Sequence, residues 1–481
     1  MSPPAQGGRP DRRLTALLTA LGAVAVGAAI QVKDGYGAPA AFAWLTVAVV
    51  AVLLAVVLPS HRAVEGALHR VLPALLVVGV AGQAYALART PPAQPFVGMA
   101  TAEPRFLLAA AGAAAAACVV AWGRGWLRYA GVVALLGVHL ALGIWTIRVQ
   151  PAPFPPIDVF IFQRDSVSAL LAGVNPYSIT FPNPYANASY YGPGLVVDGR
   201  LQFGFVYPPL SVYLSTLGQW VAGDVRYAQL GAMTLTGLFL ATMRHGPVGG
   251  LAAGLYLFTP RNLFVLEQSW TEPFVVLCLA ATVWCAARHP RTAPYLLGLF
   301  LAVKQYTVLA LPIALLLARP PMTWAGFRAV VVRAVAVAAA VTLPLALLDV
   351  PGFLRAVVTL QFSQPFRPEA LSYLGLLAGP VVPGLPPPAP PFGTGVAFAV
   401  AAVVGGLALW RVPRTPAGFA LGVAALFLAF FVLNKQAFAN YYFFVIGALC
   451  TAVAATEPAE EPWARGRRRR DQPADAQEAV T

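Results

Sequence analysis

The sequence predicts an all-α polytopic membrane protein, and three observations support this prediction. Of the 481 residues, 59% are hydrophobic and only 10% are charged, whereas soluble domains carry about 25% charged residues. Apolar runs of roughly 17–20 residues, the length that crosses a bilayer, recur along the chain. A β-barrel would instead show short segments of alternating polarity.

The apolar runs predict about 14 transmembrane helices, with both chain ends in the cytoplasm by the positive-inside rule. They are expected near residues 14–31, 39–58, 71–88, 106–122, 129–147, 226–243, 247–260, 271–287, 294–304, 306–318, 329–348, 393–410, 417–433 and 441–456. The first run follows Arg9, Arg12 and Arg13 and could pass for a signal peptide. No small-residue cleavage site follows it, so we interpret it as the first membrane helix.

The segment 208–222 can be interpreted in two ways. As a spanning helix it would place Arg244, Arg288 and Arg291 on the wrong side of the membrane. As a helix lying at the interface it leaves all three on the cytoplasmic side, and we prefer this interpretation.

The formal net charge of +14 raises the possibility of a nucleic-acid partner. The positive residues flank the apolar runs, however, as the positive-inside rule expects. The run RGRRRR at 465–470 therefore indicates a tail that touches anionic lipid, and no nucleic acid is expected as a partner. Residues 457–481 are expected to be a disordered cytoplasmic tail.

The longest polar region, residues 148–207, follows the fifth predicted helix and is expected outside the membrane. It contains Asp158 and Asp165, which a helix would place about 20° apart on one face. Asp165 can instead cap a helix that begins there. Asp158 follows two prolines at the outer end of the fifth helix, where a carboxylate can act as a general base towards a hydroxyl group.

Three lysines, Lys33, Lys304 and Lys435, stand among many arginines, and all are expected on the outer side. Such a lysine is either a compact cation suited to phosphate or a side chain that extends to the interface. We favour the second for Lys33 and the first for Lys304 and Lys435, because Gln and Tyr accompany both. Arg261, in the connector PRNLFVLEQSWTEP at 260–273, is a third candidate for phosphate. That connector is equally well explained as an ordinary interfacial loop.

Further polar and aromatic side chains near these groups are candidates for substrate binding or for supporting the site. They are Asp165, Tyr177, Tyr207, Glu267, Gln268, Glu272, Gln305, Tyr306, Gln436, Asn440 and Tyr441. The histidines and cysteines are scattered without metal-ligand spacing, so neither a metal nor a cofactor is indicated.

Several of these motifs carry a family resemblance. IDVFIFQRDSVSALLAGVNPY, followed by FGFVYPPL, resembles the first outer loop of integral-membrane glycosyltransferases of the GT-C class. RNLFVLEQSWTEP, GLFLAVKQYTVLALP and NKQAFANYYFF resemble later segments of the same proteins. The chain is most similar to the polyprenyl-phosphate-mannose-dependent mannosyltransferases, glycosyltransferase family 87, over residues 129–456.

The resemblance implies a catalytic aspartate at Asp158 and a polyprenyl-phosphate sugar as donor, with mannose favoured. It implies a lipid or glycan acceptor on the extracytoplasmic side of the plasma (inner) membrane. Residues 129–348 would form the catalytic module and 349–456 an outer loop with further helices. Residues 1–128, with four transmembrane helices, would be an additional block, because such proteins often begin with the helix that carries the aspartate. Inversion and retention at the sugar carbon both stay open.

The position of the charges also bears on two other classes of function, a transporter or flippase and a membrane scaffold. A transporter or lipid flippase usually places its charges near the bilayer midplane on broken helices. In this sequence the charges collect at the outer ends of helices, which favours an enzyme. A membrane scaffold would not require lysines confined to one side.

Overall fold

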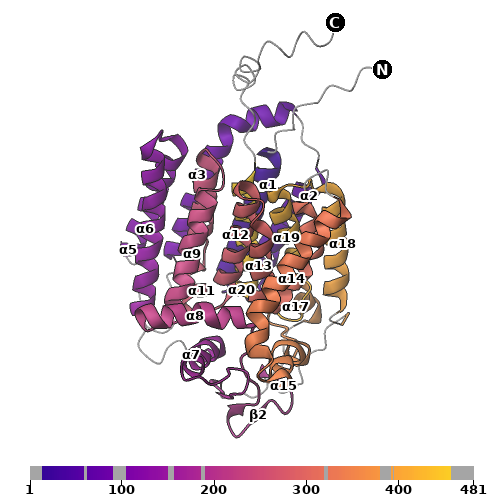
Figure 1. Ribbon diagram of the computed structural model, residues 1–481. Coiled ribbons are helices and arrows are strands. Elements are labelled where there is room, and N and C mark those ends of the chain that lie inside the picture. Colours follow the sequence, from indigo (N-terminus) through magenta and orange to yellow (C-terminus); the bar gives the residue numbers. More distant parts are fainter. Residues whose placement is uncertain are drawn as a thin grey trace.

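A computed structural model describes residues 13–58, 62–89, 104–149, 157–185, 190–318, 323–379, 392–393 and 395–456. It is a bundle of helices with a layer of loops, short helices and a small sheet at one end (Figure 1). The predicted cytoplasmic tail at 457–481 lies outside the described residues.

Six helices are long and apolar enough to cross a membrane. They are α1 (Arg13–Val32), α2 (Pro39–Val57), the part Val71–Arg89 of α3 (Arg62–Arg89), α5 (Pro104–Trp122), α6 (Trp126–Arg148) and α14 (Trp324–Ala346). Each agrees with a predicted run, and the chain is therefore a multi-pass helical membrane protein.

Shorter helices complete the bundle. They are α9 (Arg226–Ala241), α10 (Pro247–Leu257), α11 (Asn262–Glu267), α12 (Glu272–Arg288), α13 (Ala293–Val303), α18 (Gly395–Arg411), α19 (Pro416–Phe431) and α20 (Ala439–Ala455). The mostly helical character is confirmed, while the exact number of 14 spanning helices stays a prediction. The division of the chain into four segments also stays a prediction.

The predicted helix at 306–318 differs from the structure. This stretch forms two 3₁₀ helices, η2 (Gln305–Ala310) and η3 (Pro312–Leu317). Pro312 has no backbone N–H and restricts the residue before it, so an α-helix cannot run through this point undisturbed. Backbone bonds of the tighter kind, such as Leu311 N to the Val308 carbonyl at 3.0 Å, replace the α-helical ones.

Helices α19 and α20 lie at the centre of the bundle. Their residues are almost all buried, which explains why the sequences of both helices are apolar on every side. Helix α20 packs against α1, α10, α12 and α19. Gly35, just after α1, has φ +81°, and a side chain there would collide with the backbone of Ala439. The end of α1 thus meets the start of α20, so these two helices run antiparallel.

The loop layer has structure of its own. It contains α7 (Asp158–Leu171), β1 (Phe181–Pro182), β2 (Val196–Val197), β3 (Arg200–Leu201), α15 (Val350–Phe353), η4 (Leu354–Thr359), α16 (Leu360–Ser363) and α17 (Tyr373–Ala378). The strands pair antiparallel in the order β1-β3-β2, with Leu201 opposite both Phe181 and Val196. This small sheet is absent from the all-α prediction, because two-residue strands leave no alternating pattern. Separate from the bundle core, side chains such as Phe162, Phe181 and Phe205 form an aromatic core that holds the layer together.

The structure corrects one interpretation of Asp165. Helix α7 begins at Asp158, so Asp165 lies inside the helix and is not its N-terminal cap. Its carboxylate pairs with the neighbouring Arg164 at 2.8 Å, on a partly exposed surface.

Helix α8 (Pro209–Ala222), predicted to lie at the membrane interface, runs crosswise at the loop-layer end of the bundle, beside α7 (Figure 1). Trp220 and Val221 are 79% and 76% exposed, as expected for a helix that rests on lipid. The helix ends at Gly223, which adopts φ +74°.

Candidate active site

A cavity of about 1030 Å³ lies where the loop layer meets the helix bundle. Segments far apart in the sequence line it: the start of α7, residues 190–208, the connector before α12, residues 304–311, α14, and residues 360–367 and 434–441. Most of the loops predicted on the outer side therefore meet at one place.

One part of the cavity is apolar and is open at the side of the helix bundle. Its lining includes Val335 and Leu343 of α14, Val308 of η2 and Phe398 of α18. These side chains are between 44% and 55% exposed although they belong to segments of the apolar bundle. The cavity is therefore open towards the lipid-facing surface between α14 and α18.

Asp158 stands in the polar part of the cavity, in the first turn of α7. Its carboxylate accepts hydrogen bonds from the hydroxyls of Tyr191 at 2.9 Å and Tyr185 at 3.3 Å, and from the backbone N–H of Val159 at 2.8 Å. Burial raises the pKa of Asp158, while these hydrogen bonds and the charge of Arg367 partly oppose that rise. The carboxylate is therefore a stronger base than an ordinary surface aspartate.

Arg367 is the cation whose charge acts on Asp158. Its guanidinium lies over the ring of Tyr190 at 4.6 Å and over that of Phe438 at 5.4 Å, and it pairs with Glu369. Two aromatic faces and one carboxylate thus hold the guanidinium in the cavity wall.

Lys304 lines the cavity at the end of α13 and forms an ion pair with Glu272, at the start of α12. Both side chains are almost fully buried. Asn440 donates to the same Glu272 oxygen at 2.9 Å, and the Lys304 ammonium lies over the rings of Tyr207 and Tyr441 at 4.8 and 5.7 Å. The predicted phosphate-binding lysine is thus neutralised by a carboxylate that we expected only as a supporting group.

Lys435 also lines the cavity, but its ammonium donates to the carbonyls of Phe362 at 2.9 Å and Gln364 at 2.7 Å. Gln436 donates to the Pro365 carbonyl at 2.8 Å. Both side chains thus tie the segment before α20 to the end of α16 and the residues that follow it, and this contact positions the nearby Arg367.

Arg261 is not among the described residues that line the cavity. It forms an ion pair with Asp34, whose side chain does line it. The structure therefore does not bring Arg261 together with Asp158, Lys304 and Lys435.

The remaining predicted residues divide into two groups. Those that line the cavity are Tyr207, Gln268, Gln305, Tyr306, Gln436, Asn440 and Tyr441. Those that do not line it are Asp165, Tyr177, Glu267 and Glu272. Tyr177 has a structural role, since its buried hydroxyl donates to the Tyr207 carbonyl at 2.7 Å.

Sequence reasoning missed several cavity residues: Asp34, Tyr36, Tyr185, Tyr190, Tyr191 and Arg367. The motifs NPYANASYYGPG and QPFRPEALSYLG contain four of them; the first has three tyrosines, and the second has two aromatic and two charged residues. That enrichment in an otherwise apolar chain was the available signal. Asp34 and Tyr36 gave none, because the first helix pair had no assigned role.

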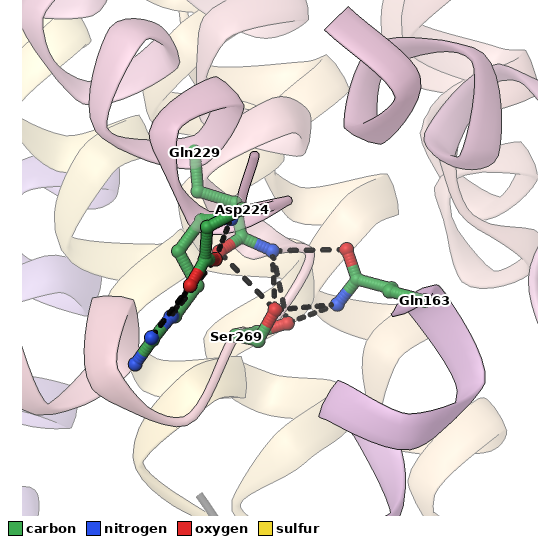
Figure 2. Close-up of polar contacts among 5 residues, drawn as sticks. Gln163, Asp224, Gln229 and Ser269 are labelled. Carbon is green, nitrogen blue, oxygen red and sulfur yellow. Dashed lines mark hydrogen bonds and ion pairs between the residues drawn. The ribbon is translucent and has the colours of Figure 1, made fainter. Parts of the chain in front are cut away.

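A buried polar network fixes α7 against the bundle (Figure 2). Gln163 of α7 donates to the backbone and hydroxyl oxygens of Ser269 and accepts from Gln229 of α9 at 2.9 Å. Ser215 of α8 donates to Gln163 at 2.8 Å. Because Gln163 lies five residues after Asp158 in the same helix, this network sets the position of the carboxylate.

Within the described part of the chain, no group of three or more His, Cys, Asp or Glu side chains is placed to hold a metal ion. Independence from metals and cofactors stays a prediction.

No family model matches the chain, and no curated protein matches it. Among solved structures, the crystal structure of ArnT from Cupriavidus metallidurans bound to undecaprenyl phosphate is similar at 16% identity and a TM-score of 0.44. The match covers 70% of this chain and 61% of that one.

Proposed function

We propose that this chain is a GT-C glycosyltransferase that moves a sugar, with mannose favoured, from a polyprenyl-phosphate donor to a hydroxyl group of a lipid or glycan. The observation that carries the proposal is the two-part cavity. A base in its polar part and an apolar part open to lipid match a donor that has a charged head and a prenyl chain.

The proposed reaction exchanges one bond at the sugar. The acceptor hydroxyl gives its proton to the Asp158 carboxylate as its oxygen bonds to the anomeric carbon. The bond from that carbon to the phosphate oxygen breaks, and its electron pair leaves with the polyprenyl phosphate. Asp158 then releases the proton to water. The raised pKa of Asp158 favours the first transfer.

Cations in the cavity wall support departure of the phosphate. Arg367 and Lys435 lie on segments joined by a hydrogen bond from the Arg367 N–H to the Lys435 carbonyl at 3.0 Å. Lys304, at the end of the short helix α13, is a further predicted contact, but its charge is balanced by Glu272, so Arg367 and Lys435 are the main candidates. We assign the extracytoplasmic side to the cavity on the distribution of positive residues.

Asp158→Asn tests the base. Proteoliposomes receive labelled polyprenyl-phosphate mannose together with lipid and glycan acceptors, and transfer is expected to fall by about 10²–10⁴-fold. Asp165→Asn is the matched control, because Asp165 stands on the same helix but outside the cavity, and it should keep transfer within about twofold. Transfer by Asp158→Asn at the wild-type rate would refute the assignment.

Two further outcomes separate the alternatives. If the wild type consumes no donor while labelled lipid crosses the bilayer, the chain is a transporter or flippase. A cysteine placed at position 165 reports the side of the membrane, and its labelling from the cytoplasm would contradict an extracytoplasmic site.

A further inference from the structure

The loop between α1 and α2, residues 33–38, reaches the cavity. Asp34 and Tyr36 both line it, although they belong to the N-terminal block that had no assigned role. The block is therefore part of the site as well as part of the bundle.

The loop is held in one conformation. The N–H of Gly37 donates to the Glu369 carbonyl at 2.9 Å, and Tyr36 pairs with Ala370 in an antiparallel bridge. Asp34 adopts φ 54°, a left-handed conformation that an aspartate keeps only when its surroundings fix it, and pairs with Arg261. The two side chains are thus pre-positioned and need little ordering when a ligand binds.

A row of aromatic rings connects this loop with Asp158. The Tyr36 ring lies 5.3 Å from that of Phe438, and the Arg367 guanidinium lies over the rings of both Phe438 and Tyr190. The Tyr190 ring lies 5.1 Å from that of Tyr185, whose hydroxyl donates to Asp158. The base therefore stands at one end of the row and Tyr36 at the other end, with Asp34 two residues before Tyr36 on the same loop.

The far end of the row suits a ligand that arrives from water. The Asp34 side chain is 38% exposed and Tyr36 is 39% exposed. The apolar part of the cavity, by contrast, is lined mainly by α14, η2, α18 and α19. A prenyl chain and a water-borne ligand would thus reach Asp158 along different walls.

A carboxylate beside exposed aromatic rings is suited to a carbohydrate. The carboxylate oxygens accept hydrogen bonds from hydroxyl groups, and a ring face packs against the C–H face of a sugar. We propose that Asp34 and Tyr36 form the acceptor subsite and bind a carbohydrate head group, with its reacting hydroxyl directed to Asp158. This inference rests on the proposed function and names the class of its acceptor.

Octyl glycosides of mannose, glucose and arabinofuranose, with octanol for comparison, are the probes for this subsite. Polyprenyl-phosphate mannose is the donor. In proteoliposomes, Tyr36→Ala and Asp34→Asn should raise the KM for the best glycoside by about tenfold, with the KM for the donor within about twofold. Tyr36→Phe keeps the ring, so its KM for the glycoside should stay near that of the wild type. Lys33→Ala is the control, because Lys33 is exposed on the same loop and does not line the cavity.

The outcomes separate this inference from the proposed function. If the wild type transfers sugar and Asp158→Asn does not, the proposed function stands. The acceptor subsite is then refuted if Tyr36→Ala and Asp34→Asn behave like Lys33→Ala, if donor KM rises in place of acceptor KM, or if the wild type accepts octanol as well as any glycoside. Refusal of every glycoside by an active wild type would also refute it.

Discussion

Replacing Tyr191 by phenylalanine removes one hydroxyl group from the surroundings of Asp158. That hydroxyl donates to the Asp158 carboxylate at 2.9 Å. The Tyr191 ring is buried, with its centroid 6.0 Å from that of Phe203, and phenylalanine keeps this packing. The variant therefore changes a hydrogen bond and leaves the shape of the wall intact.

The size and sign of the effect follow from that bond. A hydrogen bond to a charged group contributes about 1.5–3 kcal/mol, and one pKa unit corresponds to about 1.4 kcal/mol. The hydroxyl stabilises the ionised carboxylate, so its removal raises the already elevated pKa of Asp158 further. The side chain of Asp158 is partly exposed, so we expect the low end of this energy range. The pKa of Asp158 should then rise by about one pH unit in the variant.

The measurement is kcat/KM for sugar transfer as a function of pH. Because the ionised form is the base, the acidic limb of the Tyr191→Phe profile should lie about one pH unit higher, with activity recovering at high pH. Tyr185→Phe should shift it in the same direction by less, because its bond to Asp158 is 3.3 Å long. An unchanged limb with a uniformly lower rate would refute the role of Asp158 as the titrating base.

Three other predictions concern the cavity and its supports. Lys304→Met should destabilise the protein in detergent by about 3–5 kcal/mol, because it leaves Glu272 buried and unpaired, and adding Glu272→Gln should restore most of the loss in thermal unfolding. If Lys304→Met alone is as stable as the wild type, the Lys304–Glu272 pairing is contradicted. Ala339→Trp, in the apolar part of the cavity, should raise the KM for a long-chain donor by about tenfold, whereas Ala340→Trp, exposed on the same helix and outside the lining, should not. Gln163→Leu should lower kcat with little change in either KM, since it loosens α7 at a cost of about 1–3 kcal/mol, and unchanged kcat would remove this positioning role.

Hydrophobic patterning predicted most of the bundle, because a run of apolar residues long enough for a membrane has few alternative structures. It also singled out Asp158, a carboxylate at the end of such a run, and this side chain lines the cavity, while its role as the base stays a prediction. The predicted α-helix at 306–318 is wrong, because an apolar composition does not distinguish an α-helix from a 3₁₀ helix. Only Pro312 signalled the difference.

The arrangement of charges could not be predicted in the same way. Lys304 and Glu272 are 32 residues apart, and their pairing depends on how α12 and α13 pack. Lys435 has the residue context of a phosphate ligand, yet its ammonium ties two loops together. Arg367 lies in a proline-rich stretch without periodicity, where sequence alone does not indicate which side chains face a cavity.

The short length of α13 determines how deep the cavity lies. Its 11 residues extend about 16 Å, roughly half of the 30 Å hydrocarbon thickness of a bilayer. Lys304 stands at its end and lines the cavity, so the cavity begins where this short helix stops. Under the proposed function, a lipid-borne sugar would meet the enzyme without leaving its leaflet. Bilayer thickness would then set how far the head group must travel, and so act on the rate.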